Sequence, residues 1–143
     1  MDAFVQPLYE LADFDEIIRQ LKKPGIVQVS GCLDSQKAHF TNGLLREFPF
    51  RLIVAENDLK AKAFYEDFRL YDPEVLYYPA RDLIFYQADV SGGDLVRERM
   101  RVLRALLEKR PVTIVTTMSA LMMPQTPLSG IVSRILHFDK KST

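Results

Sequence analysis

Short β-branched and aromatic runs alternate with helical stretches along most of this chain, and no other feature constrains its fold as strongly. Four runs predict strands, at residues 26–30, 50–55, 75–78 and 112–117. Each run is nearly continuous in apolarity, which is typical of strands buried on both faces of a parallel sheet. Helices are predicted between them, at about 35–47, 58–71 and 94–110, with Asn57 as an N-cap. The alternation predicts right-handed βαβ units in an α/β fold: a three-layer sandwich with a mostly parallel sheet, P-loop or Rossmann-like in type.

The two ends of the chain have a different character. Residues 1–24 form a lead that contains an amphipathic helix, predicted at 14–23 and ended by Pro24 and Gly25. We expect the α/β subdomain to occupy residues 25–128. Residues 129–143 hold one more predicted strand, at 131–139, and a polar stub. Because nothing follows that strand, we expect the chain to be a fragment whose next subdomain is missing.

Composition excludes several classes of function. Nineteen basic and nineteen acidic residues balance, so no overall field would draw the chain to nucleic acid or to an anionic membrane. We expect no metal site, because the two histidines lie far apart in sequence and Cys32 is the single cysteine. Cys32 precedes a helix, which favours a reactive thiol, but we expect a small buried hydrophobe there. No apolar run approaches the length of a membrane span and no signal peptide is present, so we expect a cytoplasmic protein.

A damaged phosphate-binding motif follows the first predicted strand. In the stretch VSGCLDSQKAH, Gly31 and Lys37 match the spacing G-x-x-x-x-G-K-[ST]. Gln36 stands where the second glycine belongs, and Ala38, which has no hydroxyl to hold Mg²⁺, replaces the final Ser or Thr. Three interpretations remain open: a working nucleotide site, the relic of one, or a chance match in which Lys37 is a solvated helix lysine. We favour the relic and expect no bound cofactor.

The predicted helix at 94–110 carries an arginine-rich surface. Its apolar face is predicted to consist of Leu95, Val96, Met100, Leu103, Leu106 and Leu107. Arg97, Arg101 and Arg104 lie opposite that face, so they are either a solvated surface or a nucleic-acid patch diluted by neighbouring acidic residues. We favour the solvated surface. Arg99 falls within the apolar stripe, where an unpaired charge is costly, so we expect an acidic partner or an interface position.

An aromatic segment, residues 77–87, leaves the third predicted strand. Stacking on nucleic-acid bases would need exposed aromatic rings beside basic residues, and only Arg81 is near. We therefore expect these aromatic side chains to pack over the edge of the sheet, with Arg81 as a candidate surface residue.

Several segments together resemble a known family. VSGCLDSQKAHF, RLIVAENDLKAKAFYEDF, LYYPARDLIFYQADVSGGDLVRERMRVLRALL and VTIVTTMSALMMP occur in the order and spacing of the first, UvrB-like subdomain of the bacterial transcription-repair coupling factor. The resemblance covers residue 25 to the end. YYPARDLIFYQADVSG is similar to the family's P-x-x-[DE]-x-L-x-Y signature, with Phe85 where proline is usual. Gln36 and Ala38 fit the family's degenerate loop rather than the intact one of UvrB. Residues 78–94 are also too few for the DNA-binding hairpin of UvrB.

The resemblance implies a function for the whole parent chain and a role for this part of it. Members of the family recognise stalled RNA polymerase, displace it with an ATP-driven, DNA-binding translocase motor, and recruit UvrA for DNA repair. The motor lies outside this sequence, so the fragment itself is expected not to be an enzyme and to have no catalytic residue. We expect a scaffold that contacts neighbouring subdomains, with UvrA and RNA polymerase bound by other parts and with weak or no DNA binding. The alternatives are a nucleotide-binding domain with an unusual phosphate loop, or a DNA-binding module.

Overall fold

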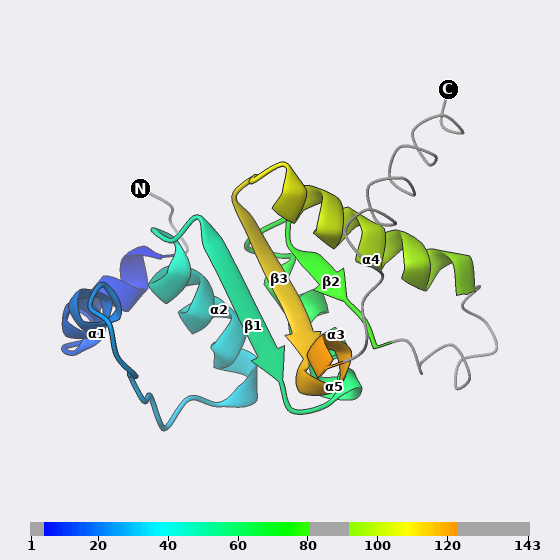
Figure 1. The fold of residues 1–143 in the computed structure, drawn as a ribbon. Coiled ribbons are helices and arrows are strands. Elements are labelled where there is room, and N and C mark those ends of the chain that lie inside the picture. The colour runs from blue at the N-terminus through cyan, green and yellow to red at the C-terminus, as the bar shows by residue number, and fades with distance from the viewer. Residues whose placement is uncertain (1–4, 81–91, 123–143) are drawn as a thin grey trace.

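The computed structural model describes residues 5–80 and 92–122, which form a small parallel sheet with helices on both sides (Figure 1). The prediction of an α/β fold is confirmed. The elements in chain order are the 3-10 helix η1 (Gln6–Glu10), α1 (Phe14–Leu21), α2 (Asp34–Leu45), β1 (Phe50–Ala55), α3 (Asp58–Phe68), β2 (Leu76–Tyr78), α4 (Gly92–Leu107), β3 (Val112–Thr117) and α5 (Met118–Met122).

The three strands are parallel and lie in the order β1-β3-β2. β1 pairs with β3 along its whole length, from Phe50 opposite Val112 to Ala55 opposite Thr117. β2 pairs with the other edge of β3, with Leu76 opposite Ile114. The last strand in sequence is therefore the central one, and all six of its residues are buried.

Each face of the sheet has its own apolar cluster. On one face, α2 and α3 pack against the strands through Ala38, Ala61, Phe68, Val75, Tyr77 and Val115. On the other face, α4 and α5 pack through Tyr78, Ala80, Val102, Ala105, Val112, Ile114 and Ala120. Because side chains alternate along a strand, Val115 and its neighbour Ile114 enter opposite clusters.

The N-terminus of α3 has the cap that the sequence predicts. The side chain of Asn57 accepts a hydrogen bond from the Lys60 backbone N–H at 2.9 Å, which confirms the predicted N-cap of α3.

A third cluster joins the N-terminal elements to α2 through Val5, Leu8, Phe14, Ile18 and Leu44. The lead segment is thus anchored to the subdomain by packing on α2.

The predicted strand at residues 26–30 is wrong. These residues have no regular secondary structure, and the side chain of Ile26 is 99% exposed. An isolated strand gains nothing from its backbone hydrogen-bonding groups until another strand pairs with them. Among residues 5–80 and 92–122, none occupies the outer edge of β1, so the apolar run at 26–30 has no position in the sheet. The predicted strand at 131–139 lies outside the described residues.

Two predictions about apolar faces also need correction. β1 is not buried on both faces, because Phe50 and Leu52 are 52% and 55% exposed on the side of α4. On α4, Leu106 and Leu107 are partly exposed, and the residues buried against the sheet are Val102 and Ala105. The strand is partly uncovered because α4 lies over β2 and β3 and stops short of β1 (Figure 1).

η1 and α1 approach α2 closely at Gly43, so we expect a larger side chain at this position to destabilise the fold. A Cβ atom at this position would lie 2.4 Å from Leu8 Cδ1 and 3.1 Å from Phe14 Cζ. Gly43→Ala should therefore lower the free energy of unfolding by about 1–3 kcal/mol through overpacking, as measured by urea denaturation. Adding Leu8→Ala removes the nearer atom, so the two changes together should destabilise less than their sum. Additive effects would contradict this packing.

Candidate functional site

The stretch that partly matches a phosphate-binding motif, residues 31–37, leads into the first turn of α2, and its side chains hydrogen-bond within the stretch. Gly31 has a φ of 88°, a conformation that favours glycine, and α2 begins three residues later at Asp34. The Gln36 side chain accepts a hydrogen bond from the Leu33 backbone N–H at 3.3 Å. Lys37 Nζ donates to Asp34 Oδ1 at 2.5 Å. The helix N-terminus that would hold a phosphate group thus has its lysine paired with a carboxylate of the same turn.

A cavity of about 410 Å³ lies beside this loop, between α2, α3 and the end of β1. Its charged lining residues are Asp34, Lys37, Glu56, Lys60 and Asp67, three carboxylates against two amines. Lys60 also pairs with Glu56. Hydrogen bonds from the two lysines hold the pKa of Asp34 and that of Glu56 below their ordinary values. Each lysine has a carboxylate partner and a third carboxylate remains, so the cavity lining has no excess of positive charge to attract a polyphosphate.

Ala38 and Cys32, which the sequence also singled out in this stretch, differ in their burial. Ala38 is buried and belongs to the apolar cluster that α3 and the sheet form. Cys32 is half-buried, not the buried hydrophobe that we expected. Among the residues that the structure describes, no three His, Cys, Asp or Glu side chains form a metal-binding group.

The predicted surface arginines divide into two kinds. Arg97, Arg101 and Arg104 are exposed, as expected for a solvated surface. Arg97 pairs with Asp94 at 3.5 Å and Arg104 with Glu108 at 2.8 Å, which reduces the charge available to a nucleic acid. Arg81 lies outside the described residues, as does most of the aromatic segment that follows Ala80.

Arg99 is buried, with only 8% of its surface exposed. Its guanidinium donates to the Pro79 carbonyl oxygen at 2.6 Å and to the Tyr78 hydroxyl at 2.7 Å. It also lies 4.1 Å from the centre of the Tyr78 ring, a cation–π distance. Arg99 therefore fixes the end of β2 against α4. The only sign of this role in the sequence is the unusual place of a charged residue in an apolar stripe.

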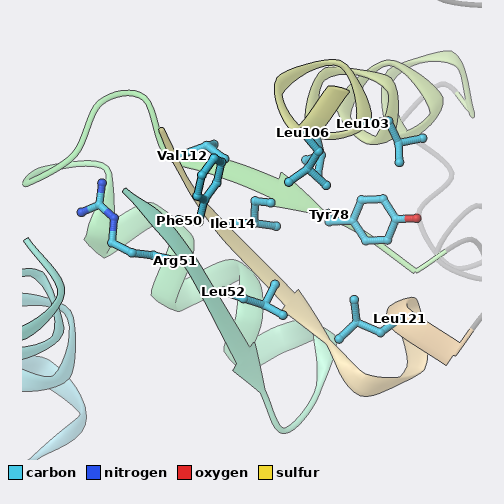
Figure 2. A pocket seen from close by; sticks show the side chains of 10 residues that line it. Phe50, Arg51, Leu52, Tyr78, Leu103, Leu106, Val112, Ile114 and Leu121 are labelled. Atoms are coloured by element: carbon cyan, nitrogen blue, oxygen red, sulfur yellow. The ribbon is translucent and has the colours of Figure 1, made fainter. Parts of the chain in front are cut away.

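An apolar groove of about 360 Å³ opens between α4 and the exposed face of β1 (Figure 2). Leu103 and Leu106 reach down from α4, Leu121 comes from α5, and Phe50 and Leu52 form the β1 side. Arg51 points away from the groove, and its guanidinium pairs with Asp72 at 3.2 Å. Sequence reasoning missed this groove because it depends on which strand α4 leaves uncovered.

A second, more polar cavity of about 470 Å³ lies between α3 and α4, beside Tyr77. The Tyr77 hydroxyl is buried and has no hydrogen-bond partner among the described residues. Burial, with smaller effects from the Asp58 and Glu98 carboxylates, raises the pKa of Tyr77 to about 12. Burial also raises the pKa of Glu98 above its ordinary value. Nothing in the sequence pattern distinguished Tyr77 from its neighbour Tyr78.

The two hydrogen bonds of Arg99 make it a stabilising residue. Arg99→Met should lower the free energy of unfolding by about 2–3 kcal/mol, because the Pro79 carbonyl and the Tyr78 hydroxyl each lose a charged donor. Arg101→Met, on the exposed side of the same helix, should change it by less than about 0.5 kcal/mol. Urea denaturation of the two variants measures the difference, and equal effects would contradict the role of Arg99.

The raised pKa of Tyr77 predicts that the folded protein loses stability at alkaline pH. An unfolded tyrosine ionises near pH 10, whereas folded Tyr77 keeps its proton up to about pH 12. Between these values the unfolded state binds fewer protons than the folded state, so stability falls as pH rises. Tyr77→Phe removes this contribution and should flatten the decline in thermal midpoint over that range. A decline as steep as that of the wild type would show that Tyr77 is not responsible.

Comparison with known proteins does not assign the chain to a family. No protein-family model, no curated protein and no solved structure matches the chain significantly. In the part of the chain that the structure describes, no helix is both long and apolar enough to cross a membrane.

Proposed function

We propose that this chain is a non-catalytic scaffold: the first, UvrB-like subdomain of a cytoplasmic transcription-repair coupling factor, with a P-loop-type fold whose phosphate site is vestigial. In this role it supports the surface that recruits UvrA by holding neighbouring subdomains in place. The ATP-driven motor and the contacts with RNA polymerase belong to other parts of such a protein. The proposal draws on the four sequence segments that resemble the family and on the geometry of the loop.

One observation carries the non-catalytic assignment: Lys37 is held by Asp34 at 2.5 Å. A phosphate-binding lysine must direct its charge to the ligand, and a carboxylate in the same turn competes for that charge. Glu56 and Asp67, in the wall of the adjacent cavity, add further repulsion. Without a hydroxyl at Ala38, the loop also has no means of holding Mg²⁺ in the usual way.

Calorimetric titration tests the vestigial loop directly. With ATP or ADP and Mg²⁺, the wild-type chain should give no binding heat at millimolar nucleotide, because its lysine is neutralised and its metal ligand is missing. The matched variant is Asp34→Asn, which frees Lys37 and leaves the loop length unchanged. Binding by the wild type that Lys37→Ala abolishes would overturn the scaffold assignment and establish a nucleotide-binding domain.

A cellular experiment tests the proposed role in repair. In the protein that carries this sequence, Lys37→Ala should leave preferential repair of the transcribed strand unchanged. Val115→Asp places an unpaired charge in the fully buried central strand, so it should unfold the subdomain and abolish that preference. Lesion removal is measured separately on the two strands. Normal strand preference in both variants would remove the chain from transcription-coupled repair.

A further inference from the structure

The cavity between α3 and α4 contains a buried polar group that the described fold leaves without a partner. Its volume of about 470 Å³ lies within the roughly 300–1,000 Å³ that is usual for small-molecule sites. Tyr77 lines it from β2 and is only 8% exposed, and its hydroxyl has no hydrogen-bond partner among the described residues. A buried hydroxyl without a partner is costly, so a ligand that supplies one is favoured.

The cavity lies at the end of the sheet where parallel α/β proteins bind ligands. α3 begins at Asp58, shortly after β1, and α4 follows β2, so the first turns of both helices lie beyond the carboxyl ends of the strands. Asp58 and Lys62 line the cavity from α3, and Asp94 and Glu98 line it from α4. Ligands of open parallel sheets occupy this side.

Lys62, Glu98 and Arg101 carry the charges of the cavity that are available to a ligand. Within residues 5–80 and 92–122, none of these three forms an ion pair, whereas Arg97 in the same cavity pairs with Asp94. Lys62 and Arg101 favour the charged form of Glu98 through space, yet burial still raises the pKa of this carboxyl. A half-buried carboxylate of this kind gains from a cation that contacts it directly.

Apolar surface completes the lining. The Tyr65 ring, on α3, stacks on that of Tyr77 with the ring centroids 5.5 Å apart. Leu95 is half-buried on α4. The cavity therefore combines two cations, one carboxylate, a neutral hydroxyl and apolar side chains. This combination complements a small zwitterion that has an apolar side chain.

We propose that this cavity binds a free α-amino acid with an apolar side chain. Lys62 and Arg101 hold its carboxylate, to which the Tyr77 hydroxyl also donates. Glu98 holds its ammonium group. Both charges of the ligand are needed, because a carboxylate alone meets the charge of Glu98 and an amine alone meets two cations. The inference does not depend on the proposed role in repair.

NMR titration of the full chain, with L-leucine as the probe, tests the site. The backbone amide signals of residues that line the cavity should shift and saturate at millimolar leucine. Two analogues each remove one charge: 4-methylpentanoate has no ammonium group, and leucinamide has no carboxylate. Each should bind at least about ten-fold more weakly than leucine, because a charged hydrogen bond is lost.

Variants assign each charge of the ligand to its side chain. Glu98→Gln should weaken leucine binding about ten-fold without weakening that of 4-methylpentanoate. Arg101→Gln should weaken both of these ligands without weakening leucinamide. Arg104→Gln, on the same helix but outside the cavity, is the matched control and should change none of the three affinities. The dispersion of the amide spectrum shows that each variant is folded.

The other outcomes overturn the proposal. No saturable shift with leucine would show that the cavity is not an amino-acid site. Equal affinities for leucine and 4-methylpentanoate would exclude the contact between Glu98 and an ammonium group. Equal losses in Arg101→Gln and Arg104→Gln would reduce the binding to non-specific attraction by surface charge.

Discussion

The fold depends on a central strand, β3, that is buried on both faces although half of its residues are threonines. Each hydroxyl is satisfied by a different element. Thr113 donates to Asp72 after α3 at 2.7 Å, Thr116 to the Tyr78 carbonyl at 2.9 Å, and Thr117 to Asp58 at the start of α3 at 3.3 Å. A buried hydroxyl without a partner destabilises a protein, so these bonds specify the position of each neighbour as well as stabilising the strand. They tie β2 and both ends of α3 to β3, which backbone pairing places at the centre of the sheet.

Around this strand, charges are placed in two very different ways. Near the loop at the start of α2, lysines and carboxylates form exposed local pairs, such as Lys37 with Asp34, which neutralise a region where a phosphate would need positive charge. Pairs of this kind contribute little stability. Arg99 is instead buried, and it donates hydrogen bonds to a backbone carbonyl and to a phenol oxygen. The first arrangement pairs the lysines of the loop region with nearby carboxylates, whereas the second joins two elements. This contrast supports the proposed scaffold role over a nucleotide-binding one.

The sheet is covered unequally, and this asymmetry gives the molecule its most distinctive surface. α2 and α3 cover one face across all three strands through a continuous apolar cluster. On the other face, α4 covers two strands and leaves the apolar side of β1 partly exposed. Since a parallel sheet is normally covered on both faces, the groove is a place where packing is incomplete within residues 5–80 and 92–122.

The sequence by itself determined most of the alternation of strands and helices, the N-cap at Asn57 and the departures from the phosphate-loop motif at Gln36 and Ala38, because these depend on neighbours a few residues apart. It also indicated that Arg99 was unusual, since a charge in an apolar stripe is visible in the helical period. Tertiary structure decided that residues 26–30 are not a strand and that β1 is covered on one face only. It also decided that the buried Tyr77 hydroxyl has no hydrogen-bond partner among the described residues, whereas the buried Arg99 guanidinium has two acceptors. These outcomes depend on which segments meet in space. A strand needs a partner at its edge, and an apolar face is buried only where a helix lies over it.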